Sequence, residues 1–351
     1  MKWAVIMAGG YGERFWPMSR RKRPKQLLPI VGDKTMIQQT VDRLRPVIAD
    51  ARMVVVTNRE QAALVRKQLP RLQHVIAEPM GRNTAPCIAL ATAMIARLDP
   101  NATIVVVPAD SWVGDGKRYQ CVVRESLALA AQQDVLITIG IRPTSAHTGY
   151  GYIKFGRGFA RGNVKFWEVE RFVEKPDAET AKKLYQSGKY RWNAGMFVWS
   201  GRSIWRAFKR LQPAMAKSCA RLAATKLRNF ASEYQRLEKI SVDYAIMEKA
   251  DNVVVANGDF PWDDVGDWPA VGRHYEKDEA GNVARGDFVG FDATDCVVVG
   301  DKKHLVASVG VRDLVIVHTP DATLVCHKNE SQKVRELVKK LAGEKKLKKL
   351  L

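Results

Sequence analysis

The sequence contains few cysteines and no long apolar run, and both shortages narrow the class of protein. Its 351 residues include five cysteines, an odd number, which are dispersed and form no C-x-x-C pair. This usage argues against a disulfide framework or a cysteine-rich zinc site, so we expect buried free thiols in a reducing compartment. No apolar run is long enough to span a bilayer, and the apolar start runs into Gly9-Gly10 without the layout of a signal peptide. We therefore expect a cytoplasmic protein without a membrane partner.

The glycine-rich segment near the start lacks both common nucleotide-binding signatures. Residues 7–14 read MAGGYGER. The dinucleotide fingerprint G-x-G-x-x-G fails because Phe15 stands at the third glycine position, and a P-loop would need a terminal Gly-Lys-Ser/Thr. Clustered glycines after a strand still let backbone N–H groups approach phosphate oxygens, although a plain turn with solvated basic residues also fits. The candidate phosphate contacts are Gly9, Gly10, Gly12, Arg14 and Lys25.

Acidic residues are scarce relative to basic ones. Fifty-seven Lys and Arg stand against 37 Asp and Glu, which gives a formal net charge of +20. A basic surface favours anionic partners, although excess Lys and Arg also simply solvate a surface. The chain lacks aromatic-rich RNA-binding signatures and zinc-finger spacing, so we expect small anions rather than nucleic acid as partners.

Residues 1–141 alternate between apolar runs and amphipathic stretches, which predicts an α/β fold with a mostly parallel sheet. The predicted strands are 2–7, 52–57, 74–77, 103–107 and 136–141, and the predicted helices 35–44, 59–68, 85–98 and 119–132. Ligands of such sheets bind beyond the carboxyl ends of the strands. Gly9-Gly10 and Pro108-Ala109-Asp110 both follow predicted strands, which predicts that two polar motifs share one edge of the sheet.

The pattern changes along the rest of the chain. We predict strands at 150–155, 164–173 and 196–199, and helices at 178–187, 203–239 (largely helical) and 241–249. After Gly281, short β-branched runs predict a small all-β appendage, closed by a helix at 331–341 and a fraying Lys-rich tail. These runs are 288–291, 296–299, 305–309, 314–318 and 323–326. The predicted domains are therefore 1–280, 281–342 and a basic tail at 343–351, and the appendage is also a candidate homodimer interface.

Two acidic motifs can bind a metal ion. Asp110 follows a buried strand, where a carboxylate can hold Mg²⁺ together with phosphates and water, although it can equally cap a helix. Residues 262–268 read WDDVGDW, with three carboxylates between two tryptophans. This motif can supply a second carboxylate, or it is an acidic turn packed by aromatic rings.

Three further polar segments have residue types suited to a sugar phosphate or a base. Residues 173–176 (VEKP) and 192–197 (WNAGMF) hold Glu, Asn and Lys, which can bind sugar hydroxyls and a phosphate. Residues 78–86 (EPMGRNTAP) lead into a predicted helix. Asn83 or Thr84 can cap that helix, or the segment can read the edge of a base.

Taken together and in this order, the polar segments resemble the sugar-nucleotidyltransferases, and more narrowly the bacterial mannose-1-phosphate guanylyltransferases. The resemblance covers about residues 1–300. The segments that carry it read MAGGYGERFWPMSR, PKQLLPI, EPMGRNTAPCIALA, VVPADSW, TGYGYI, FVEKPD, WNAGMFVW, ISVDYAIMEKA and WDDVGDW.

The resemblance implies a Rossmann-like nucleotidyltransferase domain with a mixed, mostly parallel sheet, and a β-helix-like C-terminal appendage. It implies catalytic roles for Arg14, Lys25, Asp110 and Asp264, with Mg²⁺ held by the two aspartates. Nucleotide contacts would come from Ala8, Gly9, Gly10, Gly12, Glu78, Asn83, Thr84, Ala85 and Pro86. Sugar-phosphate contacts would come from Gly149, Glu174, Lys175 and Asn193.

The implied reaction joins GTP and mannose 1-phosphate to give GDP-mannose and pyrophosphate by in-line displacement. Three departures from the family pattern are Ser111 for a frequent His, Ala146-His147 for Pro-Glu, and Ala194 for Ser. None removes a charged group from the proposed chemistry, but His147 adjoins the expected sugar pocket. Heptose or glucose 1-phosphate, or another nucleotide, therefore remain alternatives, as does a non-catalytic regulatory subunit.

Overall fold

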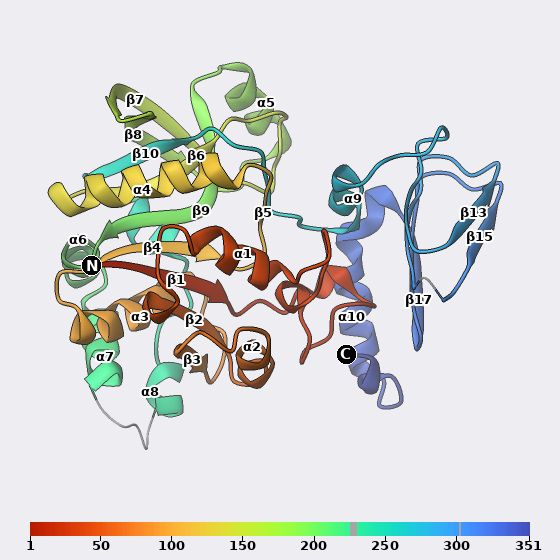
Figure 1. Ribbon diagram of the computed structural model, residues 1–351, viewed down its shortest axis with the longest axis horizontal. Helices are drawn as coiled ribbons and strands as arrows, with labels where there is room; N and C mark the ends of the chain where they lie inside the picture. Colours follow the sequence, from red (N-terminus) through yellow and green to blue (C-terminus); the bar gives the residue numbers. More distant parts are fainter. Residues whose placement is uncertain (225–229, 302) are drawn as a thin grey trace. The chain divides into compact units, whose positions relative to one another are not determined.

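The computed structural model describes residues 1–224, 230–301 and 303–351, drawn as a ribbon in Figure 1. Contacts divide the chain into two compact units. The first unit contains Met1–Gly9, Thr40–Ala109 and Val113–Trp262, and the second contains Gly10–Gln39, Asp110–Trp112 and Asp263–Leu351. No helix among the described residues is both long enough and apolar enough to cross a membrane.

A nine-stranded sheet forms the centre of the first unit, in the order β3-β2-β1-β4-β9-β6-β10-β8-β7. The strands are β1 Lys2–Ala8, β2 Met53–Asn58, β3 His74–Glu78, β4 Thr103–Pro108, β6 Leu136–Ile141, β7 Tyr152–Arg161, β8 Val164–Val173, β9 Tyr190–Ser200 and β10 Val253–Gly258. Strands β3, β2, β1 and β4 run parallel, as do β6 and β10. The pairings of β9 with β4, β6 and β7, and of β8 with β10 and β7, are antiparallel. The predicted mixed α/β sheet is confirmed.

Helices cover both faces of this sheet (Figure 1). Helix α4, Gly116–Gln132, lies on one face, and α3, Thr84–Leu98, α6, Gly201–Leu211, and α7, Pro213–Ala224, pack on the other. The central strands are runs of β-branched residues buried on both faces, as parallel strands between helices require. The remaining helices are α1 Met36–Leu44, α2 Ala62–Gln68, α5 Ala178–Gln186, α8 Phe230–Gln235, the turn η3 Asp50–Arg52 and the π-helical turn η4 Asp243–Met247.

Several predicted bounds differ from the structure. Strand β9 begins at Tyr190 rather than 196, because its polar first half pairs with β7. Strand β10 was not predicted, although its sequence VVVANG is apolar at the start. The predicted helix 241–249 is reduced to the short turn η4. Residues 225–229 of the predicted helical stretch 203–239 lie outside the described residues.

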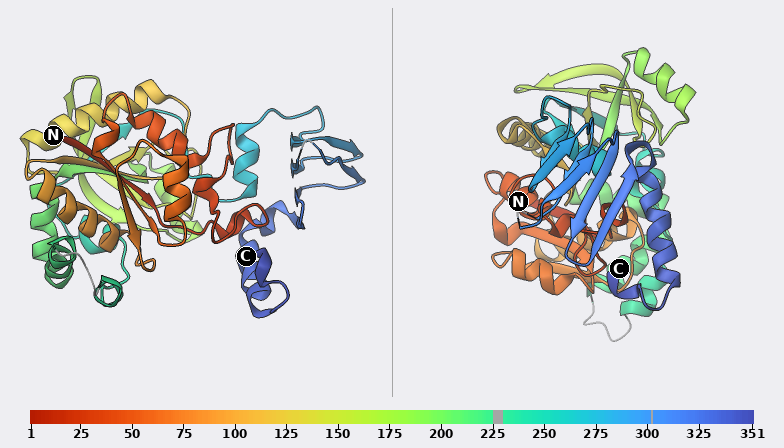
Figure 2. Two further views of the ribbon diagram at one scale, coloured as in Figure 1. Left: turned by 60° about the horizontal axis from the view of Figure 1, so that its bottom comes forward. Right: turned by 90° about the vertical axis from the view of Figure 1, so that its right-hand side faces the viewer.

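The second unit contains a small stack of β-strands (Figure 2). Strands β12, β14 and β16 pair in parallel, β17 adds antiparallel to β16, and β13 pairs in parallel with β15. Their bounds are β12 Val283–Arg285, β13 Phe288–Phe291, β14 Val297–Val299, β15 Val306–Val309, β16 Leu314–Thr319 and β17 Ala322–His327. Parallel pairing of successive short strands is the β-helix-like arrangement that the resemblance implies, and the prediction of a small C-terminal β domain is confirmed.

The core of the second unit joins this stack to segments from distant parts of the chain. Phe15, Trp268, Val297 and Val315 belong to one buried cluster. The other elements of the unit are η1 Glu13–Phe15, η2 Lys25–Leu27, α9 Trp268–Val271, η5 Gly272–His274, η6 Lys328–Lys333, α10 Val334–Gly343 and η7 Lys348–Leu350. The short strands β5, Trp112–Val113, and β11, Trp262–Asp263, pair with each other.

The predicted basic tail contacts Trp16 near the end of the chain. The indole N–H of Trp16 donates a hydrogen bond to the backbone oxygen of Leu350, at 2.9 Å. Trp16 is buried, and its N–H requires an acceptor there. The turn η7, Lys348–Leu350, lies in this segment, and the fraying of residues 343–351 stays a prediction.

Candidate active site

The glycine segment of the second unit packs against Lys25. Gly12 adopts a left-handed backbone with φ of 63°, and a Cβ there would lie 2.6 Å from Lys25 Cβ. Any side chain at this position would clash with Lys25, and the backbone conformation itself favours glycine. The hydroxyl of Ser19 donates to Gly12 O at 2.7 Å, and the Gln26 amide donates to Gly10 O at 2.8 Å. The loop is therefore fixed by the segment that follows it.

Lys25 links the two predicted metal ligands. Only 4% of this lysine is exposed, and its ammonium donates to the backbone oxygen and to Oδ2 of Asp110, at 2.8 and 3.0 Å. It also donates to the backbone oxygen of Asp264 at 2.7 Å. These three contacts use the three N–H donors of an ammonium group. In this structure the Lys25 ammonium group therefore brings Asp110 and Asp264 close together.

The three aspartates of WDDVGDW have different surroundings. The buried Asp263 accepts hydrogen bonds from Arg273 Nε and Nη2, both at 2.9 Å, and contacts His274 Nε2 at 2.9 Å. Burial raises the pKa of Asp263, but these partners outweigh burial and lower it. Asp267 caps α9, accepting from Ala270 N at 3.1 Å. Asp263 and Asp267 are thus structural anchors, which leaves Asp264 as the candidate for chemistry.

Gly266 allows two predicted catalytic side chains to lie close to its backbone. A Cβ at this position would lie 2.9 Å from Asp264 Oδ2 and 3.3 Å from Arg14 Nη1. The carboxylate of Asp264 and the guanidinium of Arg14 therefore both border the Gly266 backbone. The structure thus brings Arg14, Lys25, Asp110 and Asp264 together within the second unit.

Asp110 and Asp264 have the donor chemistry of a magnesium site. Carboxylate oxygens are the ligands that Mg²⁺ prefers, and Mg²⁺ typically takes one or two of them and completes its shell with phosphates and water. The side chain of Asp110 is 41% exposed and so accessible to a ligand. Across residues 1–224, 230–301 and 303–351, no group of three or more His, Cys, Asp or Glu side chains is arranged to hold a metal. Two carboxylates completed by a substrate form a smaller set, which these residues fit.

In the first unit, the predicted nucleotide contacts Gly9 and Glu78 lie beside each other. Gly9 directly follows strand β1, and Glu78 is the last residue of strand β3, which runs parallel to β2 as β1 does. A Cβ at Gly9 would lie 3.3 Å from Glu78 Oε2, and the Asn58 amide donates to Gly9 O at 2.6 Å. Tyr234 donates to Glu78 Oε1. Burial raises the pKa of Glu78 to about 7, against a lowering by the Tyr234 hydroxyl.

The segment that follows Glu78 begins helix α3. Asn83 is its N-cap residue, and its side-chain oxygen accepts from Thr84 N at 2.8 Å, which confirms the capping role that the sequence left open. Val242 N donates to the Thr84 hydroxyl at 2.9 Å, and Ala85 N donates to Ile240 O at 3.1 Å. Pro86 is buried in the first turn. Residues 83–85 are therefore tied to the ISVD segment at 240–243.

The ISVD segment continues to the predicted sugar contact Asn193. Asp243 accepts from Asn193 Nδ2 at 2.7 Å. The Asn193 oxygen accepts from the Thr138 hydroxyl and from Gly195 N, both at 3.1 Å. Burial raises the pKa of Asp243, and the negative charge of Glu174 adds to this. Sequence reasoning assigned no role to Asp243, although the quoted ISVDYAIMEKA motif contained it.

Glu174 and Lys175 lie beside this cluster. Lys175 Nζ contacts Glu174 Oε1 at 2.5 Å, and the Glu174 side chain is 11% exposed. Burial lowers the pKa of Lys175, but the hydrogen bond to Glu174 outweighs it and the pKa is raised. Within the described chain, Glu174 Oε2 is a buried acceptor with no hydrogen-bond partner. Such an oxygen is suited to a donor from a ligand.

Glu174 lies beside Gly151, a glycine of the TGYGYI motif that is not among the predicted site residues. A Cβ at Gly151 would lie 2.3 Å from Glu174 Oε2, and Asn193 N donates to Gly151 O at 2.8 Å. Gly149 N instead donates to His147 Nδ1 at 3.1 Å. The ring of His147 stacks on Tyr150 with centroids 4.0 Å apart. The TGYGYI motif contained both glycines, and no spacing signal in it favoured Gly151.

Comparison with known proteins assigns this arrangement to a class. The model of the Nucleotidyl transferase family matches residues 3–280. A model described as MannoseP isomerase/GMP-like beta-helix domain matches residues 286–341. The chain is thus a nucleotidyltransferase with a C-terminal β-helix domain.

The relatives narrow this class. The xanthan biosynthesis protein XanB of Xanthomonas campestris is 39% identical over 349 residues, which cover 96% of this chain and 72% of XanB. The mannose-1-phosphate guanylyltransferase of Klebsiella pneumoniae is 38% identical over 349 residues, covering 95% of this chain and 72% of that protein. A crystal structure described as mannose-1-phosphate geranyltransferase from Thermus thermophilus superposes with a TM-score of 0.88 at 36% identity, covering 97% of this chain and 99% of the other. The chain belongs to the mannose-1-phosphate guanylyltransferase family.

Proposed function

We propose that the protein transfers GMP from GTP to mannose 1-phosphate, giving GDP-mannose and pyrophosphate, in the cytoplasm. A phosphate oxygen of mannose 1-phosphate attacks the α-phosphorus of GTP. The bond from the α-phosphorus to the oxygen bridging to the β-phosphate breaks, and pyrophosphate leaves. The nucleophile is already an anion, so the reaction needs no general base and no covalent intermediate with the protein. The resemblance of the whole chain to guanylyltransferases supports this assignment.

The second unit supplies the groups for the phosphates. Mg²⁺ on Asp110 and Asp264 would neutralise charge on the phosphate oxygens. Arg14 offsets charge that develops on the leaving pyrophosphate. The backbone N–H groups of the glycine segment donate hydrogen bonds to phosphate oxygens. Lys25 holds Asp110 and Asp264 in place. The single observation that carries the proposal is this Lys25 link, which joins the Asp110 carboxylate to the backbone of Asp264, a residue far away in the sequence.

The first unit supplies the groups for the base and the sugar. The Glu78 carboxyl faces Gly9 and is suited to the N1–H and N2–H donors of guanine, which adenine lacks. Residues 83–86, which follow Glu78 at the start of helix α3, are proposed as further contacts with the nucleotide. Glu174 Oε2 accepts from a sugar hydroxyl, Asn193 adds a further contact, and Lys175 binds the sugar phosphate.

We also propose the organisation of the chain that the sequence predicts. Residues 1–280 form the catalytic domain, residues 281–342 the β domain with its closing helix, and residues 343–351 a basic tail. The β domain is proposed as the interface of a homodimer. Sedimentation of the purified protein at micromolar concentration tests this: a dimer dissociated by an Arg substitution at the exposed Phe291 supports it, and a monomer contradicts it.

Pyrophosphate release by the purified protein tests the reaction. Four nucleoside triphosphates are crossed with mannose, glucose and heptose 1-phosphates in the presence of Mg²⁺. We expect release with GTP and mannose 1-phosphate, and its loss in a folded Asp110→Ala protein. Release with another pair would keep the mechanism and contradict the substrates. Wild-type turnover by Asp110→Ala would contradict the role of Asp110.

A further inference from the structure

Gln332, near the end of the chain, contacts both the predicted triphosphate-binding arginine and the acidic turn. Its side-chain oxygen accepts from Arg14 Nη1 at 3.2 Å, and its side-chain nitrogen donates to Asp267 Oδ2 at 2.7 Å. We infer that Gln332 is a positioning residue that orients the Arg14 guanidinium for the triphosphate of the bound nucleotide. The inference rests on the proposed function, because it deepens the role given there to Arg14.

The orientation of the Gln332 amide follows from the chemistry of its two neighbours. A guanidinium has only donors and an ionised carboxylate only acceptors, so the amide oxygen must face Arg14 and the amide nitrogen must face Asp267. A lysine or leucine could not make both contacts. The glutamine therefore transmits the position of Asp267 to Arg14.

Asp267 is a firm anchor for this contact. One of its carboxylate oxygens caps α9 by accepting from Ala270 N, at 3.1 Å. The other accepts from the hydroxyl of Ser331 at 3.2 Å as well as from Gln332. Ser331 is itself buried. The turn η6, which contains Ser331 and Gln332, is thus fixed to the turn that contains Asp264.

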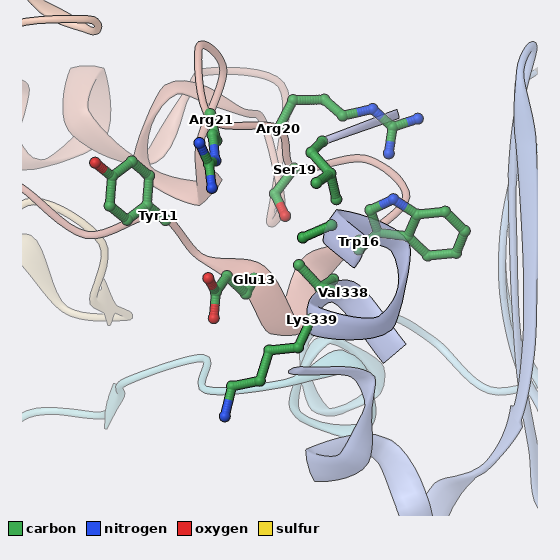
Figure 3. A pocket seen from close by; sticks show the side chains of 10 residues that line it. Tyr11, Glu13, Trp16, Ser19, Arg20, Arg21, Val338 and Lys339 are labelled. Atoms are coloured by element: carbon green, nitrogen blue, oxygen red, sulfur yellow. The ribbon is translucent and has the colours of Figure 1, made fainter. Parts of the chain in front are cut away.

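Helix α10, which follows η6, also packs against the glycine segment. Val338 and Lys339 of α10 line a cavity of about 120 Å³ together with Tyr11, Glu13 and Trp16 (Figure 3). The side chain of Arg335 lies 4.0 Å from the Glu13 carboxylate. Glu13 immediately precedes Arg14, so the C-terminal segment contacts the glycine segment on both sides of the Gln332 contact.

The contact with Gln332 leaves Arg14 suited to bind phosphate. A guanidinium has five N–H donors, and Gln332 takes one of them. The Nη1 atom that it holds is the atom that borders Gly266 and hence the Asp264 carboxylate. Gln332 therefore fixes the guanidinium at the place where the predicted metal ligand lies. Without it, Arg14 would have to be ordered by the nucleotide at the expense of affinity.

A double-mutant cycle tests the inference. Arg14→Ala, Gln332→Leu and the double variant are titrated with GTP and Mg²⁺ by calorimetry, without the sugar phosphate. A typical hydrogen bond contributes enough that we expect Gln332→Leu to weaken GTP binding about 3–10-fold. In the Arg14→Ala background, Gln332→Leu should change GTP affinity less than about 1.5-fold, because Gln332 acts through Arg14. The KM for mannose 1-phosphate should not change in Gln332→Leu.

Glu330→Gln is the matched control, because Glu330 lies in the same turn η6 and pairs with Lys333 rather than with Asp267 or Arg14. It should leave GTP affinity unchanged even if it lowers thermal stability. Unchanged GTP affinity in Gln332→Leu, or an equal loss in the Arg14→Ala background, would overturn the inference. GTP binding with the expected cycle but no pyrophosphate release from any sugar phosphate would contradict the proposed function while leaving the positioning role in place.

Discussion

The ammonium of Lys25 lies 3.0 Å from the Asp110 carboxylate and 2.8 Å from the backbone oxygen of the same residue. Lys25, for which the sequence predicts a phosphate contact, thus donates its hydrogen bonds to oxygen atoms of the protein itself. Its third contact, to Asp264 O, extends the link to the second predicted metal ligand. Lys25 therefore links the Asp110 carboxylate to the backbone of Asp264.

Replacing Lys25 tests this role. In Lys25→Met, the backbone oxygens of Asp110 and Asp264 lose their donor, and the Asp110 carboxylate is no longer held to the Asp264 backbone. We expect kcat/KM to fall about 10²–10³-fold and the free energy of unfolding to fall by about 1–3 kcal/mol. Steady-state kinetics and urea unfolding measure the two effects. Lys22→Met, at an exposed lysine nearby, should change neither, and near-normal turnover by Lys25→Met would contradict the role.

Gly266→Ala tests the close approach of Arg14 and Asp264. The added Cβ would lie 2.9 Å from Asp264 Oδ2, so that the carboxylate must move. Small displacements of positioning groups are costly, and we expect a loss of about 10–100-fold in kcat. Gly116→Ala is the control, since nothing lies within 4 Å of its Cβ position. Equal rates for the two variants would show that the two side chains need not meet at Gly266.

Glu78 should make stability depend on pH. Burial raises the pKa of its carboxyl to about 7 in the folded protein, above the value in the unfolded chain. The stabilising effect is therefore complete below about pH 4.3, the usual pKa of glutamate, and is lost as the pH rises towards 7. We expect a loss on the order of 3 kcal/mol over that window.

The change is measured by urea unfolding at a series of pH values. Glu78→Gln cannot ionise and should remove this part of the pH dependence. Glu60→Gln, at an exposed glutamate, should leave the wild-type profile intact. The assignment fails if the profiles of Glu78→Gln and the wild type are parallel between pH 4.5 and 7.

Asp243→Ala should impair the sugar phosphate more than the nucleotide. Without Asp243, the Asn193 amide loses the acceptor that fixes its orientation, which leaves an unsatisfied N–H near Glu174. We expect the KM for mannose 1-phosphate to rise about 10-fold, with the KM for GTP nearly unchanged. Glu248→Ala, an exposed carboxylate close behind Asp243, serves as the control. A parallel rise in both KM values would instead indicate a general loss of structure.

Site residues that directly follow a strand could be predicted from the sequence. The residues that fix those side chains by hydrogen bonds and ion pairs could not. Gly9 and Glu78 lie close together because the parallel strands β1, β2 and β3 end at the same edge of the sheet, and a parallel sheet follows from the alternating pattern of residues 1–141. The choice among three aspartates in WDDVGDW does not follow from any local pattern. It depends on Arg273, His274 and Gln332, which contact two of the aspartates through tertiary structure.

The missed residues share this origin. The positions of Asp243 and Gly151 in the site depend on the pairing of β9 with β7. This pairing brings Asn193 to Gly151. The polar first half of β9 gives little signal for a strand on its own, because its stability comes from its neighbours. Gln332 lies in a short turn whose partner is 318 residues away, a separation that no periodicity reports.

The composition of the second unit has a consequence for the order in which the protein is synthesised. Its core joins Phe15 and Trp16, made early, to residues such as Val315 and Val334, made late. The first unit ends at Trp262. The last strand of its sheet, β10, ends at Gly258, so the whole sheet is translated before β12, which begins at Val283. Domains generally fold as units during translation. Residues 10–39 therefore wait as an unassembled segment until the final helix emerges, and a nascent chain can complete its sheet long before its phosphate-handling residues take their places.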